Sequence, residues 1–200
     1  MSIEELHLKA EALLGRLRKN IQSPEDRDLL LAAIDALNFI YSTGQSHAFE
    51  DYRKRIDSND PPPVVASFAT RAEAETWLKK HPEPPHGASV LIADKYHTVA
   101  YRRQGDLRHL PPSPVLEYYL AQLKREEPPA AVASFNTRAE ADAWLMAQPD
   151  PPRRAWVRIA GEFHLAVHHP NITHRALYPL SMAEGFEEAE NTPDDIQEPE

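Results

Sequence analysis

Histidine is the residue type whose number and spacing in this sequence most readily suggest chemistry. Ten histidines occur among the 200 residues, and four of them lie close together: His164, His168, His169 and His174. Neutral imidazole is a common metal ligand. In an extended strand, however, residues four apart are roughly 13 Å from each other, and adjacent residues point to opposite faces. His164 and His168 therefore cannot share an ion, and we expect no metal or cofactor, only a solvated and weakly basic face.

Arginine and tryptophan precede these histidines in the same stretch of the chain. Both residue types dominate the energetic hot spots of protein interfaces. We predict a partner-binding surface formed by Arg153, Arg154, Trp156, Arg158, His164, His168 and His169. Basic and aromatic residues together are also typical of proteins that bind single-stranded nucleic acid. Nucleic acid is therefore kept as the alternative partner.

Sequence motifs of catalysis are missing from the chain. It has no cysteine, no glycine-rich phosphate loop, no nucleophile elbow and no His-Glu-x-x-His pattern, and these motifs mark several large enzyme classes. The sequence therefore favours a non-catalytic protein. A metal-dependent enzyme is the least favoured alternative.

An internal duplication organises the elements that must position these residues. Residues 63–112 align with residues 130–179 at a constant offset of 67 without gaps, and 22 of the 50 positions are identical. Self-similarity at a fixed period indicates a repeated structural unit. We predict two tandem copies of one small fold, in residues 63–126 and 130–186.

Each copy has the pattern of a strand, a helix and two further strands. Thr70 and Glu73, and in the second copy Thr137 and Glu140, have the spacing of a capping box, which begins a helix. A further helix is predicted to follow the first copy from Pro114 onward. The equivalent helix after the second copy is expected to be weaker.

The two later strands of each copy are expected to form a hairpin. A three-residue loop, Ala93-Asp94-Lys95 in the first copy, pairs Ile92 with Tyr96, and the same loop length in the second copy pairs Ile159 with Phe163. This register gathers the apolar side chains on one face, which fixes the register of a half-buried hairpin. Trp77 and Trp144 are then expected to fill the space between helix and sheet, and Trp156, on the other hairpin face, to be wetter.

The repeated phrase Ala-Ser-Phe-x-Thr-Arg-Ala-Glu-Ala, which starts at Ala66 and again at Ala133, resembles the helix start of SPOR-type peptidoglycan-binding domains. The likeness is confined to this phrase. SPOR domains lie outside the inner membrane on an anchor, and neither an anchor nor a signal is expected from residues 1–20. The family's function is therefore not carried over.

Residues 1–58 are predicted to form a helical segment. Leu6, Leu13 and Leu17 recur at helical spacing. Ser23 and Pro24 have the types preferred at the N-cap and at the first position of a second helix. A helical unit of this size buries little surface by itself, so we expect it to pack on the repeats or on a second copy of the chain.

Charge is concentrated at the C-terminal end. The net charge is −9, and residues 184–200 hold eight acids and no base. So acidic a segment cannot offset its ordering entropy by burial, and we predict a disordered acidic tail at residues 187–200. No stretch approaches the roughly 18 apolar residues of a membrane span, and the lack of cysteine fits a reducing compartment. We expect a cytoplasmic protein with no membrane contact.

The predicted fold is of the α+β class: an N-terminal helical segment followed by two tandem β-α-β-β(-α) repeats. The expected function is binding of another protein, as an inhibitor, an immunity protein or a regulatory adaptor, through the hairpin face of the second repeat. Self-association through the N-terminal helices is a further expectation.

Overall fold

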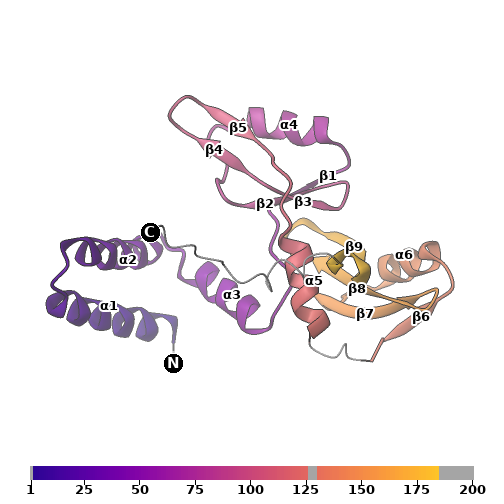
Figure 1. The fold of residues 1–200 in the computed structure, drawn as a ribbon, viewed down its shortest axis with the longest axis horizontal. Helices are drawn as coiled ribbons and strands as arrows, with labels where there is room; N and C mark the ends of the chain where they lie inside the picture. Colours follow the sequence, from indigo (N-terminus) through magenta and orange to yellow (C-terminus); the bar gives the residue numbers. More distant parts are fainter. Residues whose placement is uncertain (1, 126–129, 185–200) are drawn as a thin grey trace, which may run out of the picture. The chain divides into compact units, whose positions relative to one another are not determined.

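The structure, a computed structural model, describes residues 2–125 and 130–184, and it confirms the predicted α+β class. These residues form two compact units, an N-terminal unit up to Asp60 and a repeat unit from Pro61 (Figure 1). The predicted acidic tail, residues 187–200, lies outside the described residues.

The N-terminal unit consists of three helices, α1 (Ile3–Asn20), α2 (Pro24–Ser42) and α3 (Ser46–Asp57). Ser2 and Ser23 begin the first two helices, because their side-chain oxygens accept hydrogen bonds from the amides of Glu5 and Asp26. Such caps satisfy amide groups that the helix itself leaves unpaired. α1 and α2 pack against each other as a hairpin, and α3 contacts both.

The repeat unit contains both copies of the duplicated fold. The first copy comprises β1 (Ala66–Phe68), α4 (Arg71–Lys80), β2 (Ser89–Ile92), β3 (Lys95–Thr98), β4 (Ala100–Arg102), β5 (Leu107–His109) and α5 (Val115–Arg125). The second comprises β6 (Ala133–Phe135), α6 (Arg138–Ala147), β7 (Arg154–Ile159), β8 (Glu162–His169), β9 (His174–Pro179) and two 3₁₀ turns, η1 (Pro170–Ile172) and η2 (Leu180–Ala183). In each copy the first strand runs parallel to the second, and the third runs antiparallel to it.

Capping boxes begin α4 and α6, as predicted. The Thr70 hydroxyl accepts a hydrogen bond from the amide of Glu73, and the Glu73 carboxylate accepts one from the amide of Thr70. Thr137 and Glu140 make the same pair of bonds in the second copy. The duplicated sequence therefore reproduces the same helix start twice.

The hairpin turns contain two residues, so the predicted three-residue loop is wrong. Ala93 and Asp94 both have positive φ angles, 48° and 63°, as do Ala160 and Gly161, at 49° and 88°. Two successive residues with positive φ are typical of the type I′ turn, whose twist matches that of the paired strands. This match of twist accounts for the shorter loop.

The shorter turn shifts the register by one residue. Tyr96 pairs with Leu91 rather than with Ile92, and Phe163 pairs with Arg158. The apolar side chains consequently do not gather on one face, because a shift by one residue exchanges the faces. β2 and β7, the inner strands in these pairs, each present apolar side chains on both faces of the sheet.

Both faces of the repeat sheets are buried. Val90 belongs to a core shared with α4, while its neighbour Leu91 points the other way, into a core that both copies share. Val157 likewise belongs to the core under α6, and its neighbour Trp156 belongs to the shared core. The repeat unit therefore has three apolar layers.

α5 covers the second face of the second-copy sheet (Figure 1). Leu116 and Leu120 of this helix lie in the same core as Trp156, whose exposed fraction is 5%. The expectation that Trp156 is the wetter tryptophan is therefore wrong. Trp77 and Trp144 are only half-buried against the cores under α4 and α6.

The two copies differ in their last strands. β8 runs unbroken and pairs with β9 along the whole of the latter. In the first copy Val99 separates β3 from β4, and the equivalent of the end of β9 is Pro111-Pro112. Pro112 still bridges to His97, as Pro179 pairs with His164, but Pro111 stands in place of Tyr178 and has no amide hydrogen to donate to a strand ladder. β4 and β5 form a separate two-stranded sheet.

Arg108 and Arg175, which occupy equivalent positions, close the C-terminal ends of α4 and α6. Arg108 donates to the carbonyl oxygens of Leu78 and His81, at 2.8 and 2.6 Å, and Arg175 donates to that of Leu145 at 2.8 Å. Cations at this end of a helix satisfy carbonyl groups and oppose the negative end of the dipole. The sequence analysis did not predict this role. Its only indication in the sequence is that both copies have arginine at this position.

Trp156→Ala should destabilise the repeat unit more than Trp144→Ala. Removal of a fully buried tryptophan costs about 3–5 kcal/mol in the free energy of unfolding, whereas the half-buried Trp144 loses less contact. Urea denaturation of the full chain, followed by circular dichroism, measures both. An equal or larger loss for Trp144→Ala would contradict the placement of α5 over β7.

Candidate functional site

The seven residues of the predicted partner-binding surface do not share one face. Trp156, His164 and His169 are buried. Arg158 is exposed, and its guanidinium lies 4.3 Å from the centre of the Phe163 ring. Neighbouring strand positions point to opposite faces, so Trp156 and Arg158 lie on the α5 side of the sheet and His164 lies on the α6 side.

The other three residues of that set are Arg153, Arg154 and His168. Arg153 is exposed, while Arg154 is half-buried and donates to the Tyr119 hydroxyl at 3.3 Å. Nδ1 of His168 lies 3.3 Å from the carbonyl oxygen of Pro151. Most of the seven side chains thus take part in packing within the repeat unit. Partner contact by any of them remains a prediction.

Two histidines of the second copy meet the first copy. His169 Nε2 lies 3.2 Å from the hydroxyl of Tyr96, and His174 Nε2 lies 2.9 Å from the carboxylate of Asp94. His174 Nδ1 also lies 3.3 Å from the hydroxyl of Ser67. We call these five residues the repeat junction. We expected His169 to lie on a solvated histidine face. It is only 4% exposed, so this expectation is wrong for His169.

Hydrogen-bond counting fixes the protons around Tyr96. Its hydroxyl lies 3.0 Å from the carbonyl oxygen of Pro62, which can only accept. The single hydroxyl proton is therefore donated to Pro62, and the hydroxyl oxygen accepts from Nε2–H of His169. Burial raises the pKa of Tyr96, so this donor is retained throughout the neutral range.

Burial also governs His169. Burial, which is the largest cause, and charge repulsion from the neighbouring His174 and His168 together lower the pKa of His169 to about 4. The rings of His169 and His174 stack with 6.5 Å between their centres. His169 is therefore neutral at physiological pH, and its imidazole acts as a fixed donor between the two copies.

Asp94 orients His174. A carboxylate can only accept, so the proton of this contact resides on His174 Nε2. This hydrogen bond is the main cause that lowers the pKa of Asp94, which partial burial opposes and the charges of His174 and Arg138 assist. Asp94 is therefore ionised at neutral pH, and the Nδ1 atom of a neutral His174 is left without a proton and faces Ser67.

Within the described ranges, 2–125 and 130–184, no group of three or more histidine, aspartate and glutamate side chains is arranged to hold a metal ion. None of the helices in the same ranges is both long and apolar enough to cross a bilayer.

The N-terminal unit presents a different kind of surface. None of the described side chains in its three helices is fully buried. Nine large apolar side chains are exposed in this unit: Leu8, Leu13, Leu17, Leu29, Leu31, Phe39, Tyr41, Tyr52 and Ile56. The described part of the larger repeat unit exposes five. Apolar exposure is therefore concentrated in the helices.

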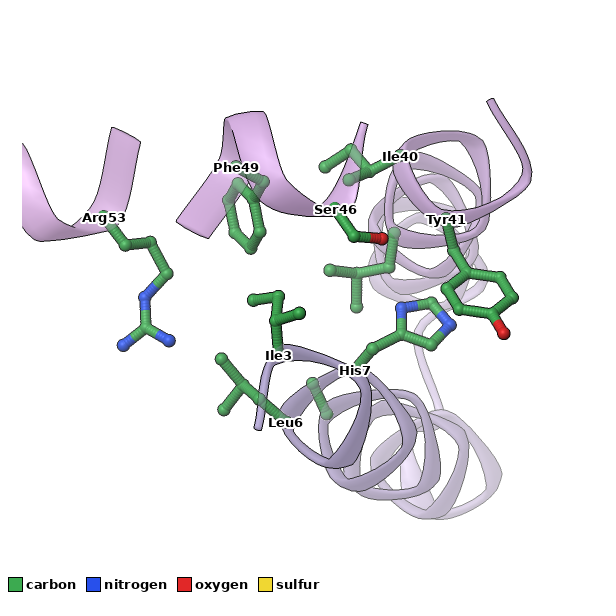
Figure 2. A pocket seen from close by; sticks show the side chains of 10 residues that line it. Ile3, Leu6, His7, Ile40, Tyr41, Ser46, Phe49 and Arg53 are labelled. Carbon is green, nitrogen blue, oxygen red and sulfur yellow. The ribbon is translucent and has the colours of Figure 1, made fainter. Parts of the chain in front are cut away.

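A cavity of about 160 Å³ lies between the three helices of this unit. Figure 2 shows Ile3 and Phe49 pointing toward each other across it, with His7 beside Tyr41 at one side and Arg53 at the other. An apolar cavity of about 150 Å³ holds a benzene-sized group. The three helices therefore do not close around a dense core of their own.

The outward side of α2 carries a continuous apolar strip. Leu29, Ala32, Ala36 and Phe39 follow one another at spacings of three and four residues, which places them along one helix face. The two large members, Leu29 and Phe39, are 65% and 60% exposed. We call these four residues the α2 strip.

Acidic residues border the α2 strip. Glu25, Asp28 and Asp35 each precede a strip residue by four positions, so each lies next to it on the helix surface. α2 contains four acids and one arginine, a net charge of −3. The strip is therefore an apolar surface with an anionic edge.

Comparisons of the chain with protein-family models, with curated proteins and with solved structures gave no match.

The repeat junction should weaken as the pH falls from about 6.5 to about 4. The folded state keeps His169 neutral because burial lowers its pKa to about 4, whereas the unfolded chain has the ordinary value of 6.5. The unfolded state binds more protons in this window, so stability falls as the pH falls, by about 3 kcal/mol in total. Urea denaturation at several pH values measures the slope.

His169→Gln keeps a hydrogen-bond donor but cannot be protonated, and it should flatten this part of the pH profile. His168→Gln, at the adjacent position, is the matched control and should leave the slope in place. An unchanged slope in His169→Gln would show that the acid sensitivity arises elsewhere.

Proposed function

We propose that the protein binds another protein, as an inhibitor, an immunity protein or a regulatory adaptor, and that the α2 strip is its contact surface. The supporting observation is the concentration of exposed apolar side chains in the N-terminal unit. Contiguous apolar patches on soluble proteins mark interaction sites. The hairpin of the second copy has less support, because Trp156 and two of its histidines are buried.

The α2 strip favours binding because apolar side chains left in water cost free energy. Burial of apolar area is favourable by roughly 25 cal/mol per Å², and a unit of this size without a dense core is only marginally stable alone. A partner that covers Leu29 and Phe39 recovers this energy and also holds the helical hairpin together. Binding and folding of the N-terminal unit are therefore coupled in this proposal.

Charge selects the kind of partner. An apolar helix face flanked by lysine or arginine complements the strip, because its cations meet Glu25, Asp28 and Asp35. A second copy of α2 fits less well, because the acids of both copies would border one symmetric contact and repel each other. The favoured occupant is a basic amphipathic helix of a different protein.

Nucleic acid is the alternative partner, and the structure offers it less support than a protein partner. A single-strand binder needs exposed aromatic rings on which bases stack, but Trp156 is in the core and Phe163 is covered on one side by Arg158.

A cytoplasmic location fits the chain's lack of cysteine.

The double variant Leu29→Glu/Phe39→Glu should weaken partner binding by at least about 30-fold. Removal of two hot-spot side chains costs at least about 2 kcal/mol, and the introduced carboxylates lose hydration when an apolar helix face covers them. The partner is first identified by affinity capture from the native cell and mass spectrometry. Affinity is then measured with the purified partner by calorimetry.

Leu8→Glu is the matched control, because Leu8 on α1 is 64% exposed and Leu29 is 65% exposed. Carbodiimide cross-linking should join Asp28 or Asp35 to lysines of the partner's helix. Equal loss of binding in Leu8→Glu and in the double variant would contradict the assignment to the strip. A dimer of the wild-type chain that the double variant dissociates would show that a second copy occupies the strip.

A further inference from the structure

Ser67, His174 and Asp94 form a hydrogen-bonded series at the repeat junction. Ser67 Oγ lies 3.3 Å from His174 Nδ1, and His174 Nε2 lies 2.9 Å from Asp94 Oδ1. Ser67 belongs to β1, Asp94 to the turn between β2 and β3, and His174 to the start of β9. Three separate segments of the chain therefore bring a hydroxyl, an imidazole and a carboxylate into one hydrogen-bonded series.

The protons of this series are arranged for base catalysis. Asp94 accepts from His174 Nε2–H, so Nδ1 of a neutral His174 has a free lone pair. The partner of that lone pair is the Ser67 hydroxyl, which must then donate. A base hydrogen-bonded to a hydroxyl and oriented by a carboxylate is the recurring arrangement of activated serine nucleophiles.

From this geometry we propose that Ser67 is a nucleophilic serine, activated by His174 and oriented through Asp94, that accepts an acyl group from small uncharged carboxylic esters. Partial exposure gives the series access to solvent, since the His174 side chain is 22% exposed and the Asp94 side chain 51%. Val65, which directly precedes β1 and lies two residues before Ser67, is 45% exposed. It offers an apolar contact for the acyl chain.

Comparison of the two copies shows that the fold does not require this series twice. Ser134 is the equivalent of Ser67 in the second copy, but the equivalent of Asp94 is Gly161 and the residue aligned with His174 is Leu107. A series built on Ser134 would thus lack both the base and the carboxylate. The chemistry exists only on one side of the duplication, which is expected of a site rather than of a structural need shared by both copies.

The proposed reaction needs no reagent other than the ester and water. Ser67 Oγ bonds to the ester carbonyl carbon while its proton passes to His174 Nδ1. The carbon–oxygen bond to the leaving group then breaks, and His174 returns the proton to the departing alkoxide, which leaves as an alcohol. Water attacks the acyl-serine by the same proton transfers and releases a carboxylic acid. Asp94 stabilises the imidazolium that forms in each step.

The test is covalent labelling of the full chain with an alkyl fluorophosphonate, in which Ser67 displaces fluoride and His174 takes the hydroxyl proton. We expect one adduct, located on Ser67 by peptide mass spectrometry. Ser67→Ala should abolish it, and Ser134→Ala, the matched control, should leave it unchanged. His174→Gln should slow labelling by at least about 100-fold, the usual contribution of a general base. Hydrolysis of 4-nitrophenyl acetate should follow the same order.

A second comparison keeps the test valid if His174→Gln disturbs folding. Ser67→Cys and Ser134→Cys place a thiol at equivalent positions of the two copies, and only the first faces a base. Because the thiolate is the reactive form, chloroacetamide should alkylate Ser67→Cys at least about tenfold faster. Equal alkylation rates, or absence of a fluorophosphonate adduct on Ser67 in the wild-type chain, would overturn the proposal. Binding through the α2 strip is independent of either result.

Discussion

Burial of the repeat sheets on both faces is the constraint on which the rest of the structure depends. The strands are short, and small sheets are stable only when they pack on something else. In the three-stranded and the four-stranded sheet, α4 or α6 covers one face and the shared core covers the other. That core contains Leu91 from the first copy and Leu165 from the second. The duplication therefore forms one interdependent unit.

Interdependence of the copies explains why polar groups meet between them. Once the shared core places β1 and the turn at Asp94 near the start of β9, the polar side chains at its margin must find partners or lose hydrogen bonds. Tyr96, His169 and Asn171 satisfy this requirement with bonds across the junction. Ser67, His174 and Asp94 meet it too, and only their combination also has the form of a catalytic series.

Local signals were predictable from sequence, and signals that depend on distant segments were not. The capping boxes at Thr70 and Thr137 were predictable because four neighbouring residues contain all the information. The hairpin register failed because Ala93 and Ala160 adopt positive φ angles that their residue type does not indicate, although Asp94 and Gly161 beside them are types that tolerate such angles. The His174 contacts span 80 and 107 positions, and no linear motif encodes such a group.

Trp156 shows why residue composition alone cannot locate a binding surface. Arginine and tryptophan gather wherever two surfaces bury each other, and the physics is the same whether both surfaces belong to one chain or to two. In the second copy the covering element is α5, which the chain itself supplies directly after the first copy. The α2 strip differs in this respect, because Leu29 and Phe39 remain exposed. Exposure after folding, rather than residue type, therefore separates an apolar surface that the chain itself covers from one that stays in contact with solvent.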